Sequence, residues 1–180
     1  MHDELTKVDI KKMQEEIEYR RNVLAPTLRE EVRQARELGD LSENFEYHAA
    51  RREMNKNIGR INYLQRMIDT AVVIEPKSEE NSVGLFDTVT LYVEDVDEEM
   101  TITIVTTLRQ NSLKNLISKE SPIGKALLGK KSGERIFVRV SDDYGYYAVI
   151  RGIEKGSDDE SLEISPYYDK EPPVGRLFFI

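Results

Sequence analysis

Two long stretches of the chain carry apolar residues at helical spacing. In the first, apolar side chains recur mostly three, four or seven residues apart: Ile10, Met13, Ile17, Leu24, Leu28, Val32, Ala35 and Leu38. The second repeats the pattern: Tyr47, Ala50, Met54, Ile58, Ile61, Leu64 and Ile68. Spacing of this kind is typical of a helix that buries one face. The sequence therefore predicts two long amphipathic helices.

Only a few residues join the two predicted helices, so the helices must run antiparallel. Their narrow apolar stripes are best buried against each other, as in a coiled coil. We therefore expect residues 1–76 to form a helical hairpin. Roughly 30 residues at about 1.5 Å each give an arm on the order of 40 Å long. Pro26 lies inside the first helix, where proline bends a helix, and we expect a kink there.

The apolar period changes from helical spacing to two beyond residue 76, so we place a domain boundary there. Two runs rich in β-branched residues, 88–93 and 100–105, flank the acidic turn 94–99 and predict a β-hairpin. Two further strands are expected at 135–140 and 146–151. The sequence thus predicts a small antiparallel β domain over residues 77–154.

A short helix is expected within this β domain. Ser121 is a capping residue, Pro122 suits the first helical position, and Gly129 suits the end of the helix. The fold class is therefore α+β: an N-terminal antiparallel coiled-coil hairpin and a C-terminal antiparallel β domain with a short helix. Residues 155–180 form a C-terminal extension whose role the pattern does not indicate.

Composition and charge narrow the classes of protein. The chain has 180 residues, of which 39% are hydrophobic and 33% charged, and it has no cysteine. The net charge of −8 argues against a general nucleic-acid coat protein. No apolar run approaches the roughly 20 residues that span a bilayer, and the N-terminus does not resemble a signal peptide. We expect a cytoplasmic protein with no membrane contact and no disulfide.

The turn between the two helices carries two acidic residues, Asp40 and Glu43, and two interpretations are open. In the structural one, Gly39 ends the first helix and Asp40 caps the second, with Glu43 at capping-box spacing. In the functional one, two carboxylates at the end of a rigid arm supply oxygen ligands to Mg²⁺. Because Mg²⁺ is typically held by one or two carboxylates plus substrate phosphates, another molecule would complete that site.

Basic residues gather behind this turn: Arg33, Arg36, Arg51, Arg52 and Lys56. They form a solvated face if each pairs with a neighbouring glutamate. Alternatively, they make a weak electrostatic contact with an RNA backbone.

Two runs carry a family resemblance. The run from Ala35 to Arg51, ARELGDLSENFEYHAAR, closely resembles the signature of the bacterial Gre transcript-cleavage factors, GreA type. The run from Ser121 to Lys130, SPIGKALLGK, resembles their second signature and follows about eighty residues later. The resemblance covers roughly residues 5–154 and favours the functional interpretation of the acids. One departure is Phe45, where alanine is more common in the signature.

The resemblance implies a function and a partner. It implies that the C-terminal domain is FKBP-like and docks on RNA polymerase, with Glu120, Ser121 and Pro122 in the contact. Glu120 stands where aspartate is more usual. The hairpin would enter the secondary channel of the polymerase and rescue arrested complexes by stimulating cleavage of backtracked nascent RNA. Among the basic residues, Arg36 and Arg51 best match the RNA-contacting patch of the family.

The same resemblance implies the site and its cofactor. Asp40 and Glu43 would hold a second Mg²⁺ that is shared with the polymerase and absent from the isolated protein. The protein would then be a cofactor of the polymerase and not itself an enzyme. The sequence agrees, because it has two histidines and no cysteine, and it lacks the nucleophile, phosphate-loop and HExxH motifs of self-contained hydrolases.

Three other functions remain open. A Gre-like protein can occupy the channel and regulate or inhibit polymerase without cleavage. The C-terminal domain alone would suit a prolyl isomerase or chaperone, because fold does not determine function. A purely structural coiled-coil protein would self-associate through the arm.

Overall fold

The computed structural model describes residues 4–37, 44–76, 79–158 and 160–165. These residues divide into two compact units. The first, here called the sheet unit, contains the described residues of Met1–Lys12 and Ile68–Ser165; the second, the helical arm, is Met13–Met67. Within the described part of the chain, no helix has the length and apolar character needed to cross a membrane.

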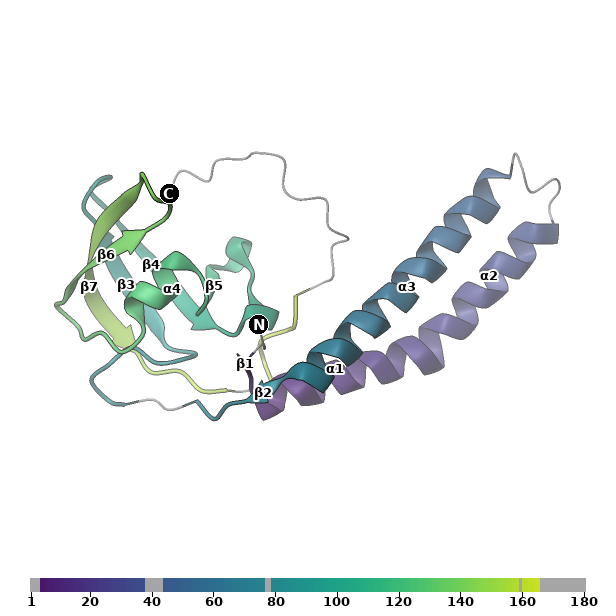
Figure 1. Ribbon diagram of the computed structural model, residues 1–180, viewed down its shortest axis with the longest axis horizontal. Coiled ribbons are helices and arrows are strands. Elements are labelled where there is room, and N and C mark those ends of the chain that lie inside the picture. Colours follow the sequence, from purple (N-terminus) through teal and green to yellow (C-terminus); the bar gives the residue numbers. More distant parts are fainter. Residues whose placement is uncertain (1–3, 38–43, 77–78, 159, 166–180) are drawn as a thin grey trace. The chain divides into compact units, whose positions relative to one another are not determined.

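The helical arm is an antiparallel pair of helices, as the sequence predicts (Figure 1). Its first helical segment consists of α1 (Lys7–Tyr19), a π-helical turn (Arg20–Leu24) and α2 (Ala25–Glu37), and its second is α3 (Phe45–Thr70). The ends of α1 before Met13 and of α3 after Met67 belong to the sheet unit. Hydrogen bonds link Arg36 to Tyr47, and Glu16 to Arg60. The earlier residue on the first segment, Glu16, contacts the later residue on α3, and the later residue, Arg36, contacts the earlier one. The two helical segments therefore run in opposite directions.

The π-helical turn lies immediately before Pro26, where the sequence predicts a kink. In this turn the amide of Ala25 donates to the carbonyl oxygen of Arg20, five residues earlier. Proline has no amide hydrogen, and its ring clashes with the carbonyl four residues earlier in a regular α-helix. A wider turn accommodates that ring, so the helical path continues through Pro26 with one irregular turn.

The interface between the helices is apolar near the distal end of the arm but polar in the middle. Distally, Val32, Ala35 and Tyr47 form a buried cluster. In the middle, the predicted stripe residue Ile58 is 47% exposed, whereas Asn57 and Arg60 are each 3% exposed. The expectation that Ile58 belongs to the buried stripe is therefore wrong.

The π-helical turn explains this polar layer. It contains no buried residue, so it adds no fully buried apolar side chain to the interface between the helices. Instead, Arg20 donates to the side-chain oxygen of Asn57 at 3.1 Å, and Asn57 donates to the carbonyl oxygen of Arg20 at 3.3 Å. Glu16 accepts hydrogen bonds from both Arg20 and Arg60. The buried polar groups of this layer thus satisfy one another.

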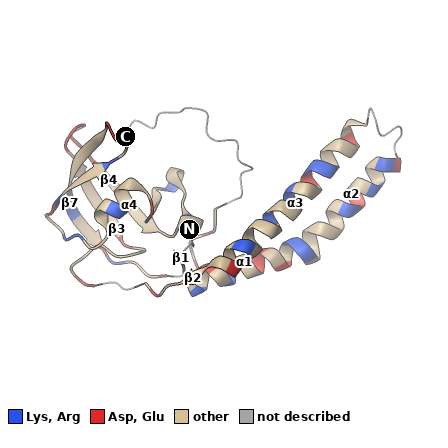
Figure 2. Ribbon diagram, in the orientation of Figure 1, with Lys and Arg blue, Asp and Glu red and all other residues tan. Residues whose placement is uncertain are grey.

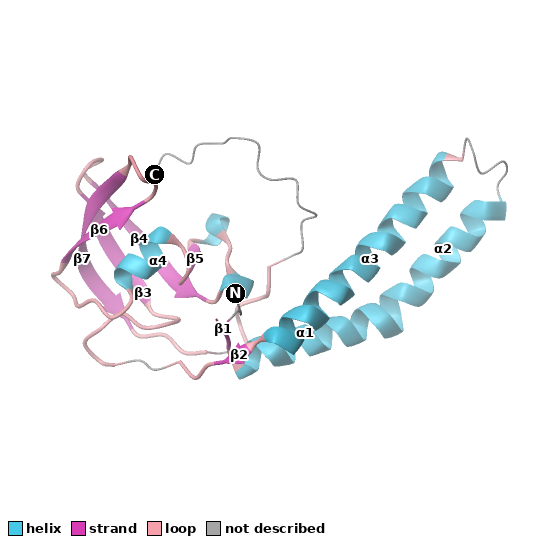
Figure 3. Ribbon diagram, in the orientation of Figure 1, coloured by secondary structure: helices cyan, strands magenta, loops and turns pink. Residues whose placement is uncertain are grey.

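A five-stranded sheet forms the centre of the sheet unit (Figure 3). Its strands are β3 (Thr88–Val93), β4 (Glu98–Val105), β5 (Leu116–Ser118), β6 (Arg135–Arg139) and β7 (Gly145–Glu154), in the order β5-β4-β3-β7-β6. The predicted hairpin is β3–β4, and the two later predicted strands pair as β6–β7, all antiparallel. Two short 3₁₀ helices, Thr107–Arg109 and Ser112–Lys114, precede β5.

Two pairings differ from the predicted antiparallel sheet. β5 pairs parallel with β4, which makes the sheet mixed. A separate parallel pair joins β1 (Glu4–Leu5) to β2 (Val72–Val73). Strands of two or three residues are too short to show an alternating pattern, so the sequence contains no signal for them.

The buried face of the sheet packs against α4 (Pro122–Leu127), the predicted short helix. Leu127 is completely buried in the same core as Val89, Leu91 and Ile150. Gly124 lies so close to the end of β5 and the loop after it that a Cβ there would stand 2.3 Å from the carbonyl oxygen of Ser118. Glycine at this position therefore lets α4 pack against the loop.

The described part of the C-terminal extension is part of the sheet unit. Gly156 donates its amide to Asp87 at 3.0 Å, and Asp158 accepts a 2.7 Å hydrogen bond from Arg109. Ser165 donates its amide to the carbonyl oxygen of Leu108 at 2.8 Å. Leu162 packs against the main core. The first half of the extension therefore belongs to the fold of the sheet unit.

Candidate functional site

The two acids that the sequence singles out, Asp40 and Glu43, lie outside the described residues. The arm residues on either side are described, up to Glu37 and from Asn44 onward. Among the residues that the structure describes, no group of three or more His, Cys, Asp or Glu is placed to hold a metal ion. The assignment of Asp40 and Glu43 to Mg²⁺ stays a prediction.

The start of α3 is capped by Asn44. Its side-chain oxygen accepts a 2.9 Å hydrogen bond from the amide of Tyr47, three residues later, which is the N-cap arrangement. Its side-chain amide also donates to the carbonyl oxygen of Ala35 on α2 at 2.6 Å. Since α3 begins at Phe45, the structural interpretation that Asp40 caps this helix is wrong.

Tyr47 lies between two of the predicted basic residues. It is 6% exposed, and its hydroxyl oxygen is 3.5 Å from guanidinium nitrogens of both Arg36 on α2 and Arg51 on α3. The hydrogen bond from Arg36 lowers the pKa of the Tyr47 hydroxyl below its usual value, and the positive charge of Arg51 acts in the same direction. Tyr47 thus holds two cations together across the two helices.

Both basic and acidic positions occur along α2 and α3 (Figure 2). The other basic residues differ in whether a glutamate pairs with them. Arg33 pairs with Glu30 and Glu37 at 2.6 Å each, and the Arg33 hydrogen bond lowers the pKa of Glu30 to about 2. Lys56 pairs with Glu53 at 2.8 Å. For Arg33 and Lys56 the solvated, paired face is the better description.

Arg36, Arg51 and Arg52 are different, because none of them forms an ion pair with a carboxylate in the described part of the chain. Arg36 and Arg51 contact Tyr47, and the guanidinium carbon of Arg52 lies 6.0 Å from the centre of the Phe45 ring. The predicted patch of five cations therefore reduces to three whose charge is not offset by a described neighbour.

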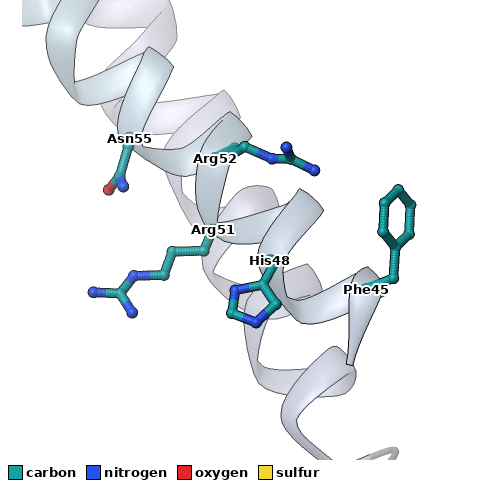
Figure 4. Close-up of a pocket in the computed structure, with 5 residues that line it drawn as sticks. All are labelled: Phe45, His48, Arg51, Arg52 and Asn55. Atoms are coloured by element: carbon teal, nitrogen blue, oxygen red, sulfur yellow. The ribbon is translucent and has the colours of Figure 1, made fainter. Parts of the chain in front are cut away.

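The outer surface of α3 has an open depression of about 520 Å³ (Figure 4). Its lining residues come from the first three turns of the helix: Phe45, His48, Arg51, Arg52 and Asn55. Figure 4 shows the Arg52 side chain extending to the side on which the Phe45 ring lies, and Arg51 extending away from that ring. The sequence marks Phe45 only as an unusual residue, and the depression is visible only in the structure.

The predicted docking residues surround the start of α4. Ser121 is the N-cap, because its hydroxyl oxygen accepts from the amide of Gly124 at 3.0 Å, and its hydroxyl donates to the carbonyl oxygen of Ser118 at 2.7 Å. Pro122 occupies the first helical turn. Glu120 is exposed and pairs with Lys125 at 3.1 Å. Ser121 therefore has a structural role, while Glu120 and Pro122 present exposed surface.

Asn44 and Tyr47 have roles that were not predicted from the sequence. A signal for Asn44 exists, because asparagine is a preferred N-cap and stands directly before the second apolar stripe. For Tyr47 no sequence signal separates a core residue from one whose hydroxyl joins two arginines. That role depends on Arg36 being brought beside it from the other helix.

Two family descriptions match the chain: Transcription elongation factor, N-terminal, over residues 4–73, and Transcription elongation factor, GreA/GreB, C-term, over residues 77–151. Transcription elongation factor GreA of Caldanaerobacter subterraneus subsp. tengcongensis is 45% identical over 139 residues, which cover 76% of this chain and 87% of that protein. The GreA of Nautilia profundicola is 39% identical over 151 residues, which cover 83% of this chain and 93% of that protein.

Solved structures of similar proteins include the crystal structure of GreA factor homolog 1 (Gfh1) of Thermus thermophilus. It is 24% identical to this chain, and the match covers 86% of this chain and 100% of that one, with a TM-score of 0.40. The described residues 152–158 and 160–165 lie beyond the end of the C-terminal family match.

Proposed function

Since the chain belongs to the GreA/GreB family of transcription elongation factors, we propose that it binds RNA polymerase in the cytoplasm and stimulates cleavage of backtracked nascent RNA. The helical arm enters the secondary channel, and the sheet unit docks on the polymerase. The polymerase performs the chemistry, so the protein is its cofactor and not an enzyme by itself.

The capping of α3 by Asn44 is the observation that carries this proposal. A capping role was the main structural explanation for Asp40 and Glu43, and Asn44 already fills it at the start of α3. No described helix end requires these two carboxylates as a cap. Their position in the sequence, at the turn of a long antiparallel arm, suits delivery to a site inside another protein.

The donor chemistry of these residues fits Mg²⁺. Two carboxylates are the usual protein contribution to a Mg²⁺ site that phosphate oxygens and water complete. When bound, the ion supplies charge stabilisation for in-line attack of water on a phosphodiester, as the second ion of a two-metal site. Asp40 and Glu43 would hold it, and the polymerase would hold the first ion.

The three cations without a described carboxylate partner supply the RNA contact. Arg36 and Arg51 are held as a pair by Tyr47, so their positive charge is concentrated at one place on the arm. A concentrated charge of this kind suits a phosphate of the RNA backbone. Arg33 and Lys56 contribute less, because neighbouring glutamates pair with them.

Docking on polymerase would use the exposed residues at the start of α4. Glu120 and Pro122 provide the contact surface, and Ser121 keeps that surface in place by capping the helix. No feature of the described residues favours a prolyl isomerase or a purely structural coiled-coil protein. A channel-occupying regulator without cleavage is the second candidate, because such a protein would use the same arm.

The experiment measures RNA release from a backtracked elongation complex with Mg²⁺. The intact protein is compared with Asp40→Asn, with Glu43→Gln, and with Glu31→Gln as a control that removes one charge from an exposed position on α2. We expect each tip variant to lower the cleavage rate by about a hundredfold or more, or about 3 kcal/mol, because a metal ligand is lost. Glu31→Gln should cleave at the normal rate.

A competition assay separates cleavage from binding. Asp40→Asn and Glu43→Gln should compete with the unmodified protein for polymerase at the same concentration as the unmodified protein itself does. If the intact protein binds polymerase but does not stimulate cleavage, the protein is a channel-occupying regulator. If both tip variants cleave normally, Asp40 and Glu43 do not hold the ion.

A further inference from the structure

Phe45 is an exposed aromatic side chain that the packing of the arm does not require. It is 75% exposed, whereas the apolar residues that join α3 to α2 in the same region are almost fully buried. A single exposed apolar residue needs no special explanation. Here, however, the ring lies beside cationic side chains, and that combination indicates a particular kind of ligand.

The neighbours of Phe45 follow the helical repeat. His48, Arg52 and Asn55 lie three, seven and ten residues after it, so they form one stripe on the outer face of α3, and Arg51 lies at the edge of the stripe. These five residues line the depression of about 520 Å³ that Figure 4 shows. The Arg52 guanidinium carbon is 6.0 Å from the centre of the Phe45 ring.

The charge on this stripe is positive. Arg51 and Arg52 have no ion pair with a described carboxylate, and the five lining residues include no acid. The acidic residues Glu46 and Glu53 lie about 80 to 100° around the helix axis from Phe45, because each residue of an α-helix adds about 100°. Glu53 also forms an ion pair with Lys56. The stripe therefore suits an anion, and its aromatic end suits a flat ring.

An unpaired nucleotide has both features, since it carries a phosphate and a base. Aromatic side chains stack with exposed bases, and arginine contributes cation–π contacts and phosphate hydrogen bonds. We propose that Phe45 and Arg52 bind one unpaired base of single-stranded RNA, with Arg51 on the adjoining phosphate. This rests on the proposed function, which brings the single-stranded end of backtracked RNA to the arm.

Stacking on Phe45 has a consequence for cleavage. Asp40 and Glu43 precede Phe45 in the sequence by five and two residues. A base held on Phe45 restricts where the RNA backbone can lie next to these acids. Phe45 is therefore a positioning residue for the RNA and not a catalytic residue. Every base has an aromatic face, so the contact should tolerate any RNA sequence.

The test uses the full-length protein with a backtracked elongation complex whose displaced RNA carries 2-aminopurine, a base whose fluorescence falls on stacking. Mg²⁺ is omitted during the fluorescence measurement, so that the RNA stays intact. The protein is compared with Phe45→Leu, which keeps an apolar side chain, and with Phe45→Trp, which keeps an aromatic ring. The half-saturating concentration for cleavage is then measured with Mg²⁺.

We expect the unmodified protein and Phe45→Trp to quench the fluorescence and Phe45→Leu to lose the quenching. Phe45→Leu should also need about 5- to 100-fold more protein for half-maximal cleavage, the range typical for loss of one stacked base. Arg52→Gln should weaken quenching without abolishing it. Equal quenching by Phe45→Leu and the unmodified protein would overturn the proposal.

Two results distinguish this inference from the proposed function. If the unmodified protein quenches the base but no cleavage is stimulated, the stacking stands and the cleavage function fails. If cleavage proceeds but no quenching depends on Phe45, the stacking fails alone. If Phe45→Leu instead weakens binding to polymerase that carries no RNA, the ring contacts protein and the stacking is wrong.

Discussion

Asn44 shows how much one side chain contributes at the turn of the arm. Its oxygen caps α3 and its amide nitrogen binds α2, so it fixes both the start of one helix and its distance from the other. One of the two interpretations of the sequence gives the cap to Asp40, because aspartate at capping-box spacing is an equally good signal. Only the position at which α3 begins decides between the two residues.

Replacement of Asn44 by alanine should loosen the first turn of α3. Loss of an N-cap of this kind costs about 1 kcal/mol. We expect the amide of Tyr47 to exchange with solvent about fivefold faster, as measured by hydrogen exchange. Asn44→Asp is the control, because it keeps an acceptor for that amide while a charged carboxylate replaces the donor to Ala35. Unchanged exchange in Asn44→Ala would show that another group caps α3.

At the scale of elements, the middle of the arm is held by hydrogen bonds and not by apolar packing. Burial alone would raise the pKa of Glu16, but hydrogen bonds from Arg60 and Arg20 outweigh burial and hold that pKa below its usual value. A carboxyl group with a lowered pKa in the folded state stabilises the fold above its ordinary pKa of about 4.5. That contribution disappears as the pH falls through the lower, folded value.

The polar layer should therefore make arm stability dependent on pH. Replacement of Glu16 by glutamine removes the carboxylate charge from three hydrogen bonds with Arg20 and Arg60, and it should lower the free energy of unfolding at pH 7 by about 1.5 to 3 kcal/mol. As the pH falls below 4.5 and through the lowered pKa of folded Glu16, the variant and the unmodified protein should converge. Thermal unfolding followed by circular dichroism at several pH values measures the loss of stability at pH 7 and its dependence on pH. Glu15→Gln, at an exposed neighbouring position, is the control.

A difference between Glu16→Gln and the unmodified protein that stays constant from pH 7 down to pH 3 would contradict this account. It would mean that the loss comes from packing and not from the charge of the carboxylate. The comparison tests the electrostatic reason for the layer separately from its effect on stability.

At the scale of the whole molecule, Arg109 joins three distant parts of the chain within the sheet unit. Its side chain is fully buried, and it pairs with Asp9 near the N-terminus at 2.6 Å and with Asp158 in the extension at 2.7 Å. The guanidinium also lies 4.9 Å from the centre of the Phe86 ring. Asp9 and Thr6 cap the start of α1 through reciprocal hydrogen bonds. The extension therefore stabilises the beginning of the chain through Arg109.

The contact of the extension should be measurable as stability. Asp158→Asn removes the negative charge beside a buried guanidinium and should lower the free energy of unfolding by about 1 to 3 kcal/mol. For a protein of this size, each kcal/mol corresponds to a fall in Tm of about 2 to 4 °C. Glu163→Gln is the matched control, because Glu163 is exposed in the same segment. An unchanged Tm for Asp158→Asn would show that the contact between Asp158 and Arg109 adds nothing to the stability of the fold.

Local pattern in the sequence determined the architecture of this protein. The helical spacing around Met13 and Leu64, the alternation in 88–93, and the capping signal at Ser121 each depend on neighbouring residues, so they predicted the arm, the hairpin and α4 without the fold. The two signature runs determined the family for the same reason. Short-range patterns need no knowledge of what lies across an interface.

Tertiary structure decided the features that depend on residues distant in sequence. The polar layer around Asn57 follows from the π-helical turn on the opposite helix, and the pairing of β5 with β4 comes from strands too short to show a period. The burial of Arg109 depends on partners 100 and 49 residues away. Of the five predicted cations, only the fold separated those paired with glutamates from those around Tyr47 and Phe45. Burial and ion pairing depend on which residues the fold brings next to a side chain. The local sequence does not specify those neighbours.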